Sequence, residues 1–307
     1  MYYTKEGVKM LPKLSCAISG FSRAGSVFDA VKTVAEAGFD GVDFSLSTYS
    51  RRGGVALCQD EWWRSWIEAV STYLKELKLP VVQAHAAWDQ TVPRDLSYQP
   101  PEPICFRNLE ACAMLGCTRL VFHPLLYPYR VETKELAAKL HAYSVRWFRE
   151  LLPTAARLGV TVEIENMFDY YHVWQPGDPP YVFTTAEQLL ALADELSGDG
   201  VVGLCLDTGH ANISGQDPAQ MIRAYGKRLD CLHLNDNFGR SRGLREDLHL
   251  FPGEGNLDWR AILRALRETG FFGAYNLELI ADLASLNADD RTSRLRHGRE
   301  AFAAMLR

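Results

Sequence analysis

Residues 204–257 concentrate side chains that can bind a divalent metal ion. The segment contains two aspartates and three histidines: Asp207, His210, His233, Asp247 and His249. Each comes at or just after the end of a short apolar run, where a buried strand would deliver it to the rim of a sheet. Carboxylates and imidazoles grouped in this way are suitable ligands for zinc or manganese. The segment therefore predicts a metal-dependent enzyme.

Metal-capable side chains also end the other strands that the sequence predicts. The third to eighth strands end in His85, His123, Glu165, Asp207, His233 and Glu278. Any one of them has an ordinary structural explanation; Asp207, for instance, can cap the next helix. Six in succession are hard to obtain by capping alone. So many carboxylates at one rim would repel one another unless a cation neutralised them.

The predicted strands alternate with amphipathic helices along the whole chain. Short apolar runs, typical of strands buried on both faces, occur at 14–18, 39–46, 80–88, 118–126, 160–167, 201–207, 229–236 and 274–280. Eight right-handed βαβ units that close on themselves form a (β/α)8 TIM barrel, here a single α/β domain over residues 1–307. A doubly wound open sheet is the alternative, but no GxGxxG motif follows the first strand.

The long connections follow strands, and the connections from helix to strand are short. Elaborated loops therefore lie on the C-terminal face of the barrel, where barrel active sites are found. Barrel closure would bring nine metal-capable side chains to this rim: His85, His123, Glu165, Asp207, His210, His233, Asp247, His249 and Glu278.

Two glutamates compete for the rim position of the fifth strand. Glu163 and Glu165 differ by two positions and so point to the same face. We favour Glu165, because it is nearer the strand end and adjacent to Asn166. Glu163 is expected to lie deeper in the barrel.

The composition indicates an ordinary globular protein. The 307 residues are 47% hydrophobic and 23% charged, and the net charge of -5 gives no electrostatic argument for a nucleic-acid partner. Seven cysteines, an odd number without a CxxC pair, predict reduced thiols in a cytoplasmic protein. We expect neither a signal peptide nor a membrane span, since long apolar windows are missing.

Several loop features leave alternatives open. The aromatic loop residues Trp88, Tyr170, Tyr171, Trp174, Tyr181 and Phe183 suit stacking against a sugar or packing of the loops on themselves. The segment 251–259, FPGEGNLDW, is either a tight turn or a support for His249. Arg240, Arg242 and Arg245 are candidates for binding a substrate phosphate, or are solvated charges.

These motifs resemble those of the xylose isomerase-like barrel superfamily, over nearly the whole chain. The most specific pieces are LDTGHAN at 206–212, HLND at 233–236 and DLHLFPGEG at 247–255. Glu165-Asn166 and the FHP around His123 support them. The superfamily includes sugar isomerases and epimerases and the endonuclease IV type of abasic-site nuclease.

The resemblance to sugar epimerases implies one metal ion held by Glu165, Asp207, His233 and Glu278. The two glutamates would also be the acid/base pair, and His210 would contact substrate. Some epimerases place the strand-five glutamate three residues before the asparagine, which here is Glu163. The resemblance to endonuclease IV implies instead up to three zinc ions on all nine rim residues.

We therefore predict a zinc- or manganese-dependent sugar or sugar phosphate isomerase or epimerase with one to three metal ions. It would move a proton through an enediolate, with Glu165 and Glu278 as acid and base. The alternative is a zinc-dependent abasic-site phosphodiesterase, which we rank second because the loops suit rings better than a polyanion. The expected partner is a small sugar or polyol-derived molecule rather than nucleic acid or a membrane, and the sequence is compatible with a homo-oligomer.

Overall fold

The computed structural model describes residues 2–3, 9–10, 12–20, 26–46, 62–87, 90–169, 181–198, 200–239, 247–280 and 282–307. Within them, eight parallel strands form one sheet in the order β10-β3-β4-β5-β6-β7-β8-β9. These strands are β3 (Leu14–Ala17), β4 (Gly41–Ser45), β5 (Val81–His85), β6 (Arg119–Phe122), β7 (Thr161–Glu165), β8 (Val202–Asp207), β9 (Leu229–His233) and β10 (Tyr275–Leu277). Each overlaps one of the predicted strands. A short antiparallel pair, β1 (Tyr2–Tyr3) and β2 (Lys9–Met10), stands apart and was not predicted.

The sheet closes into a barrel between its two end members, β9 and β10. The Leu234 N–H donates to the Asn276 carbonyl at 2.8 Å, and the Glu278 N–H donates to the Leu234 carbonyl at 3.1 Å. These bonds form a parallel bridge just beyond the end of β9. The predicted single-domain (β/α)8 barrel is confirmed, and the doubly wound sheet is wrong.

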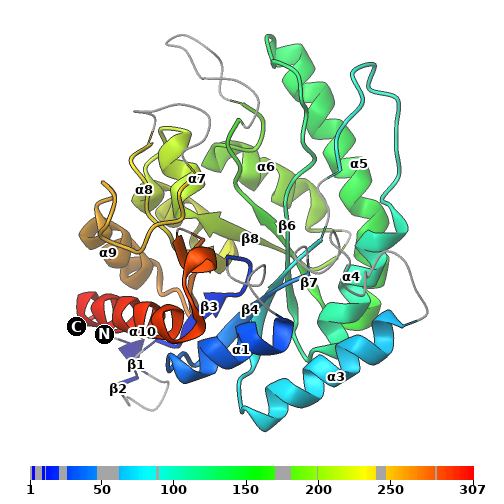
Figure 1. The fold of residues 1–307 in the computed structure, drawn as a ribbon. Coiled ribbons are helices and arrows are strands. Elements are labelled where there is room, and N and C mark those ends of the chain that lie inside the picture. Colours follow the sequence, from blue (N-terminus) through cyan, green and yellow to red (C-terminus); the bar gives the residue numbers. More distant parts are fainter. Residues whose placement is uncertain are drawn as a thin grey trace.

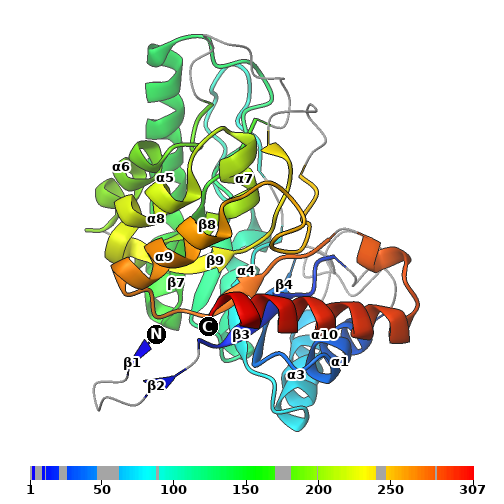
Figure 2. The ribbon, with the colours of Figure 1, turned by 90° about the vertical axis from the view of Figure 1, so that its left-hand side faces the viewer.

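Helices form a layer around the strands (Figure 1). They are α1 (Val27–Glu36), α3 (Trp63–Glu76), α4 (Pro103–Met114), α5 (Lys134–Leu158), α6 (Ala186–Leu196), α7 (Thr208–Ile213), α8 (Pro218–Tyr225), α9 (Trp259–Thr269) and α10 (Ala288–Met305), with 3-10 turns η2 (Gly226–Arg228) and η4 (Asp282–Ser285). The last helix, α10, packs against the first, α1, and α8 packs against α9 on another flank (Figure 2). The short helix α7 starts directly after β8, with Asp207 as its N-cap.

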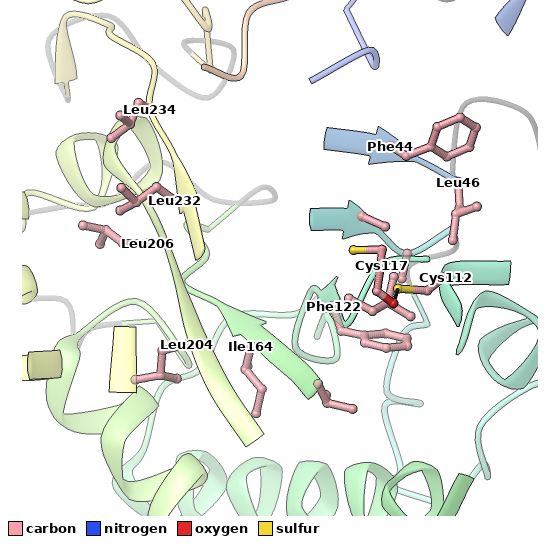
Figure 3. Close-up of a cluster of buried hydrophobic side chains, with 14 of the residues drawn as sticks. Phe44, Leu46, Cys112, Cys117, Phe122, Ile164, Leu204, Leu206, Leu232 and Leu234 are labelled. Carbon is pink, nitrogen blue, oxygen red and sulfur yellow. Dashed lines mark hydrogen bonds between the residues drawn. The ribbon is translucent and has the colours of Figure 1, made fainter. Parts of the chain in front are cut away.

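The strands are buried on both faces. Side chains that contribute to the main core outside the barrel include Phe122, Ile164, Leu204, Leu206 and Leu232 (Figure 3). The intervening Cys205 and Cys231 form a separate small cluster with Val121. Successive residues thus face the helices and the barrel interior in turn, which explains the continuous apolar runs.

The described cysteines are all unpaired and buried, namely Cys16, Cys105, Cys112, Cys117, Cys205 and Cys231. Cys58 lies outside the described residues. None of the helices in the described ranges combines the length and the apolar character that crossing a bilayer requires.

Candidate metal centre

Glu165, the last residue of β7, lies at the centre of the rim cluster and is 1% exposed. Its Oε1 is 2.9 Å from Nδ1 of His233 and 3.4 Å from Nδ1 of His210. Its Oε2 is 3.3 Å from Nε2 of His85 and 3.4 Å from Nε2 of His123. One carboxylate therefore faces four imidazoles that come from β5, the end of β6, α7 and β9.

Glu165 also belongs to a four-residue group of potential metal ligands. Glu165, Asp207, His233 and Glu278 each offer one ligand atom, and these atoms lie within 4.8 Å of one another. Nδ1 of His233 is also 3.4 Å from Oε2 of Glu278. The group contains three acids and one imidazole on four successive strand ends. A second group, His85, His123 and Glu165, shares the same glutamate.

A third group lies on the outer side of the cluster. Asp247 is 2.9 Å from Nε2 of His249 and 3.5 Å from Nε2 of His210. His249 has φ +46°, an uncommon conformation for a residue with a Cβ. The structure thus brings together all nine side chains that the sequence placed at the rim. A further candidate, Cys205, was missed: it lies with Glu165 and His233 in a fourth group.

Most of the imidazoles have one nitrogen held by an acceptor, which leaves the other nitrogen facing the cluster. Nδ1 of His85 lies 3.0 Å from the Ala86 carbonyl, Nδ1 of His210 lies 2.9 Å from the Asn166 carbonyl, and Nδ1 of His249 lies 3.1 Å from the Glu278 carbonyl. An N–H donated to a carbonyl fixes the tautomer and directs the lone pair of the other nitrogen, Nε2, toward the centre. This is how metal-binding histidines are commonly oriented.

Asp207 ends β8 and has two roles. As the N-cap of α7, it accepts from the His210 backbone N–H at 2.7 Å, and it also accepts from the Asn235 side chain at 2.7 Å. Burial raises the pKa of Asp207 to about 6, against the lowering effect of the His210 charge. The predicted capping role is therefore present, and it fixes His210 beside the carboxylate rather than excluding Asp207 from the cluster.

The segment 251–259 wraps around a carboxylate that the sequence did not single out, Asp236. This side chain accepts from the Gly253 and Leu257 N–H groups at 2.9 and 3.2 Å and from the Trp259 indole at 2.7 Å. Backbone bonds between Asp236 and Leu250, an isolated antiparallel bridge, then fix the segment that carries His249. The segment combines the two alternatives: it is a tight turn, and it supports His249.

Neighbouring charges shift the pKa values of an acid and an imidazole of the cluster in opposite directions. Burial raises the pKa of Glu165, but the charges of His233 and His123 outweigh this effect and lower the pKa to well below its ordinary value. Burial lowers the pKa of His249, but Asp247 and Glu278 raise it to about 10. A metal ion would compete with these protons for the same atoms.

Glu163 is not part of the cluster. It lies at the opposite end of the barrel interior, where its Oε2 would be 2.1 Å from a Cβ on Gly203 and Asp230 is close by. Both of its oxygens are buried with no hydrogen-bonding partner among the described residues. Burial, followed by the charge of Asp230, raises its pKa well above the ordinary value.

The loop residues divide into two sets. Tyr181 is buried and donates to the Tyr127 carbonyl at 2.6 Å, and Phe183 stacks on His141, so both pack within the protein. An aromatic ring beside the cluster is Phe168, whose centroid is 5.0 Å from that of His210 and which the sequence did not suggest. The residues Trp88, Tyr170, Tyr171, Trp174, Arg240, Arg242 and Arg245 lie outside the described residues.

The arrangement of atoms fits a divalent metal ion. Oε2 of Glu165 is buried and has no hydrogen-bonding partner in the described part of the chain, although two imidazoles face it. The Nε2 atoms of His85 and His123 are 3.1 Å apart. A proton shared between these two nitrogens, or a cation bound by both, would remove the repulsion between their lone pairs. The mixed nitrogen and oxygen set is one that zinc and manganese accept.

Fold and rim together define a (β/α)8 barrel protein with a cluster of acids and imidazoles at the C-terminal ends of its strands. The chain belongs to the xylose isomerase-like TIM barrel family, which matches residues 31–305. Among its relatives, a D-psicose 3-epimerase of Enterocloster bolteae is 34% identical over 137 residues, which are 45% of this chain and 39% of that protein. An inosose isomerase of Bacillus subtilis is 28% identical over 172 residues, 56% of this chain and 57% of that protein. The chain thus matches only about half the length of these relatives or less.

Solved structures share the fold at low identity. A D-psicose 3-epimerase crystallised in the presence of D-fructose has a TM-score of 0.71 at 17% identity, covering 96% of this chain and 99% of that chain. The IolI protein with a bound zinc atom has a TM-score of 0.70 at 19% identity, with the same coverage of the two chains.

Proposed function

We propose that this protein is a divalent-metal-dependent sugar isomerase or epimerase. The observation that carries the proposal is the four-residue group of Glu165, Asp207, His233 and Glu278, in which two glutamates flank one imidazole. The family and its sugar-epimerising and isomerising relatives support the substrate class. Zinc in the IolI structure supports zinc as one candidate metal, with manganese as the other.

The four residues of this group would hold one ion, and the other rim residues could hold one or two more. When bound, the metal would polarise a substrate carbonyl and stabilise the negative charge that develops on proton removal. His85, His123, His210, Asp247 and His249 are the additional ligand candidates in the other groups. Among these, His210 is also our candidate for holding a substrate hydroxyl.

The two glutamates differ in how far they are open to a substrate. The Glu278 side chain is 10% exposed, whereas Glu165 is 1% exposed. Glu278 also lies 3.6 Å from His249, the imidazole that contacts the 23% exposed Asp247. A substrate entering at the rim therefore meets Glu278 first. We assign Glu278 and Glu165 as the acid and base that remove and return the proton through an enediolate, with Glu278 the more accessible of the two.

The decisive experiment is proton exchange from ketohexoses, including D-psicose and D-tagatose, into deuterated water with zinc or manganese present. Glu278→Gln should reduce the exchange at least about 100-fold, since it removes an acid/base group. Glu195→Gln, an exposed carboxylate on α6 that pairs with His141, is the matched control and should exchange normally. Exchange that survives in the Glu278 variant would remove this residue from the chemistry.

A zinc-dependent abasic-site phosphodiesterase is a second candidate, favoured by one observation. Four groups of ligand atoms, three of them sharing Glu165, give room for more than one ion. Two results together would favour this activity. The protein would cleave duplex DNA that contains an abasic site when zinc is present, and it would not exchange protons from ketoses. The small-molecule substrate and a homo-oligomeric state remain predictions.

A further inference from the structure

Asp43, on β4, lies in the barrel interior beneath the rim cluster and is 1% exposed. One of its oxygens, Oδ2, accepts three hydrogen bonds. The donors are Nε2 of His233 at 3.1 Å, the Gln83 side chain at 2.9 Å and the Asn276 side chain at 2.9 Å. Four strands, β4, β5, β9 and β10, thus meet at a single carboxylate oxygen.

The contact with His233 lies on the far side of the ring from the candidate metal. Its other nitrogen, Nδ1, faces Glu165 at 2.9 Å and Glu278 at 3.4 Å. If Nε2–H is donated to Asp43, the lone pair of Nδ1 is left for an ion bound by the two glutamates. We propose that Asp43 is a positioning residue that fixes the ring orientation and the tautomer of His233 for metal binding. This inference rests on the proposed metal centre.

The charge of Asp43 is as informative as its position. Its second oxygen, Oδ1, is buried and has no hydrogen-bonding partner among the described residues. An asparagine would set its NH2 group either where Oδ1 lies, buried without an acceptor among the described residues, or toward the donors that meet Oδ2, so the site suits a carboxylate, which only accepts. Burying a full negative charge is nevertheless costly. The cost is offset if the charge polarises His233 and attracts a cation above it.

A purely structural role is the competing explanation. Asp43 ties β4 to the strands on both sides of the barrel seam, and the network continues from Asn276 to the Ser15 hydroxyl at 2.9 Å. Gln83 separates the two explanations. It donates to the same Asp43 oxygen and to the Leu232 carbonyl at 3.2 Å, so its loss weakens the network without touching His233.

The experiment compares Asp43→Asn with Gln83→Met as the matched control. Zinc affinity is measured by competition with a chelator, and the unfolding temperature is measured after metal removal. Cobalt(II) replaces zinc as a spectroscopic probe, because its visible absorption reports the geometry of the bound imidazole. We expect Asp43→Asn to weaken zinc binding roughly 10- to 100-fold, the usual effect of losing an outer carboxylate partner, and to change the cobalt spectrum. Gln83→Met should lower the unfolding temperature of the metal-free protein and leave the zinc affinity within about twofold.

Two results would overturn the assignment. One is a zinc affinity and cobalt spectrum in Asp43→Asn that match those of the unchanged protein. The other is an equal loss of affinity in both variants, which would mean that network stability alone matters. Zinc binding that depends on Asp43, in a protein without sugar turnover, would reject the proposed isomerase and keep this inference. A protein that binds no divalent ion would reject both.

Discussion

Glu163 and Glu165 lie two positions apart on β7 and yet meet opposite electrostatic surroundings. The Glu165 carboxylate faces four imidazoles. Burial raises its pKa, but two of them, His233 and His123, outweigh burial and hold the pKa well below the ordinary value. Glu163 meets Asp230 and no hydrogen-bond donor among the described residues, and burial keeps its pKa well above the ordinary value. The surroundings thus favour the charged form of Glu165 at the rim and the protonated form of Glu163 deeper in the barrel.

This contrast predicts different outcomes for two isosteric substitutions. Glu165→Gln removes a charge shared by three of the candidate ligand groups and should abolish tight zinc binding. Glu163→Gln changes a group that lies outside the rim cluster and whose protonated form burial favours, so it should leave zinc binding intact. Metal content after gel filtration, measured by atomic emission, checks both variants. If Glu163→Gln lost the metal instead, the strand-five ligand assignment would be reversed.

The neighbouring acid Asp230 should make stability depend on pH. Burial raises the pKa of Asp230, and Arg119 opposes this effect. Glu163 is the other ionisable group that faces it. A raised pKa in the folded state means that the folded protein binds the proton more tightly than the unfolded chain, so the stabilising effect is present at low pH and is lost as the pH rises through the folded pKa.

Asp230→Asn removes this titration. An aspartate in the unfolded chain titrates at about pH 4. As the pH rises from there, we expect the free energy of unfolding of the variant to increase relative to that of the unchanged protein. Urea unfolding of both proteins at several pH values measures the difference. A gap that stays constant with pH would show that Asp230 has the same pKa in both states.

The sequence predicted the rim well because the relevant signal is local. A metal-capable residue at the end of an apolar run, such as His85 or His233, can be identified without knowing its neighbours. The helical alternation then implied a barrel, and barrel closure supplied the convergence. The eight strands and the nine rim side chains followed from these two steps.

What the sequence could not give depends on contacts across the barrel. Asp43 is an isolated acid in an apolar strand, and its link to His233 spans 190 positions. The carbonyls that orient His210 and His249 are backbone atoms, which every residue has. Tyr181 looked like a loop aromatic available to a ligand, but its hydroxyl bonds to the backbone of another loop at Tyr127.

Gly203 provides a packing test of the lower end of the barrel. A Cβ at this position would lie 2.1 Å from Oε2 of Glu163 and 2.8 Å from Oδ2 of Asp230. Gly203→Ala should therefore lower the free energy of unfolding by about 1–3 kcal/mol, the usual cost of overpacking an interior. Urea unfolding gives the value.

Two further variants make this measurement specific. Gly198→Ala is the matched control, since a Cβ there meets no described atom within 4 Å, and it should be close to neutral. Combining Gly203→Ala with Glu163→Ala removes the side chain that the new methyl group displaces. A coupling free energy near zero in this double-mutant cycle would show that the cost of Gly203→Ala does not come from a clash with the Glu163 side chain.

Asp247 allows the outer ligand group to be tested separately from the inner one. Within the described part of the cluster it contacts Nε2 of His210 and Nε2 of His249, and it belongs to the outer group alone. Asp247→Asn should therefore remove any ion held by that group and keep the ion held by Glu165, Asp207, His233 and Glu278. Zinc titration followed by calorimetry measures both the number of ions and the affinity of each. Because the inner ion depends on carboxylates that Asp247 does not contact, its dissociation constant should change by less than about tenfold, equivalent to about 1.4 kcal/mol. Loss of all zinc from this variant would mean that the groups bind metal as one unit, and the separation of an inner catalytic ion from an outer one would have to be abandoned.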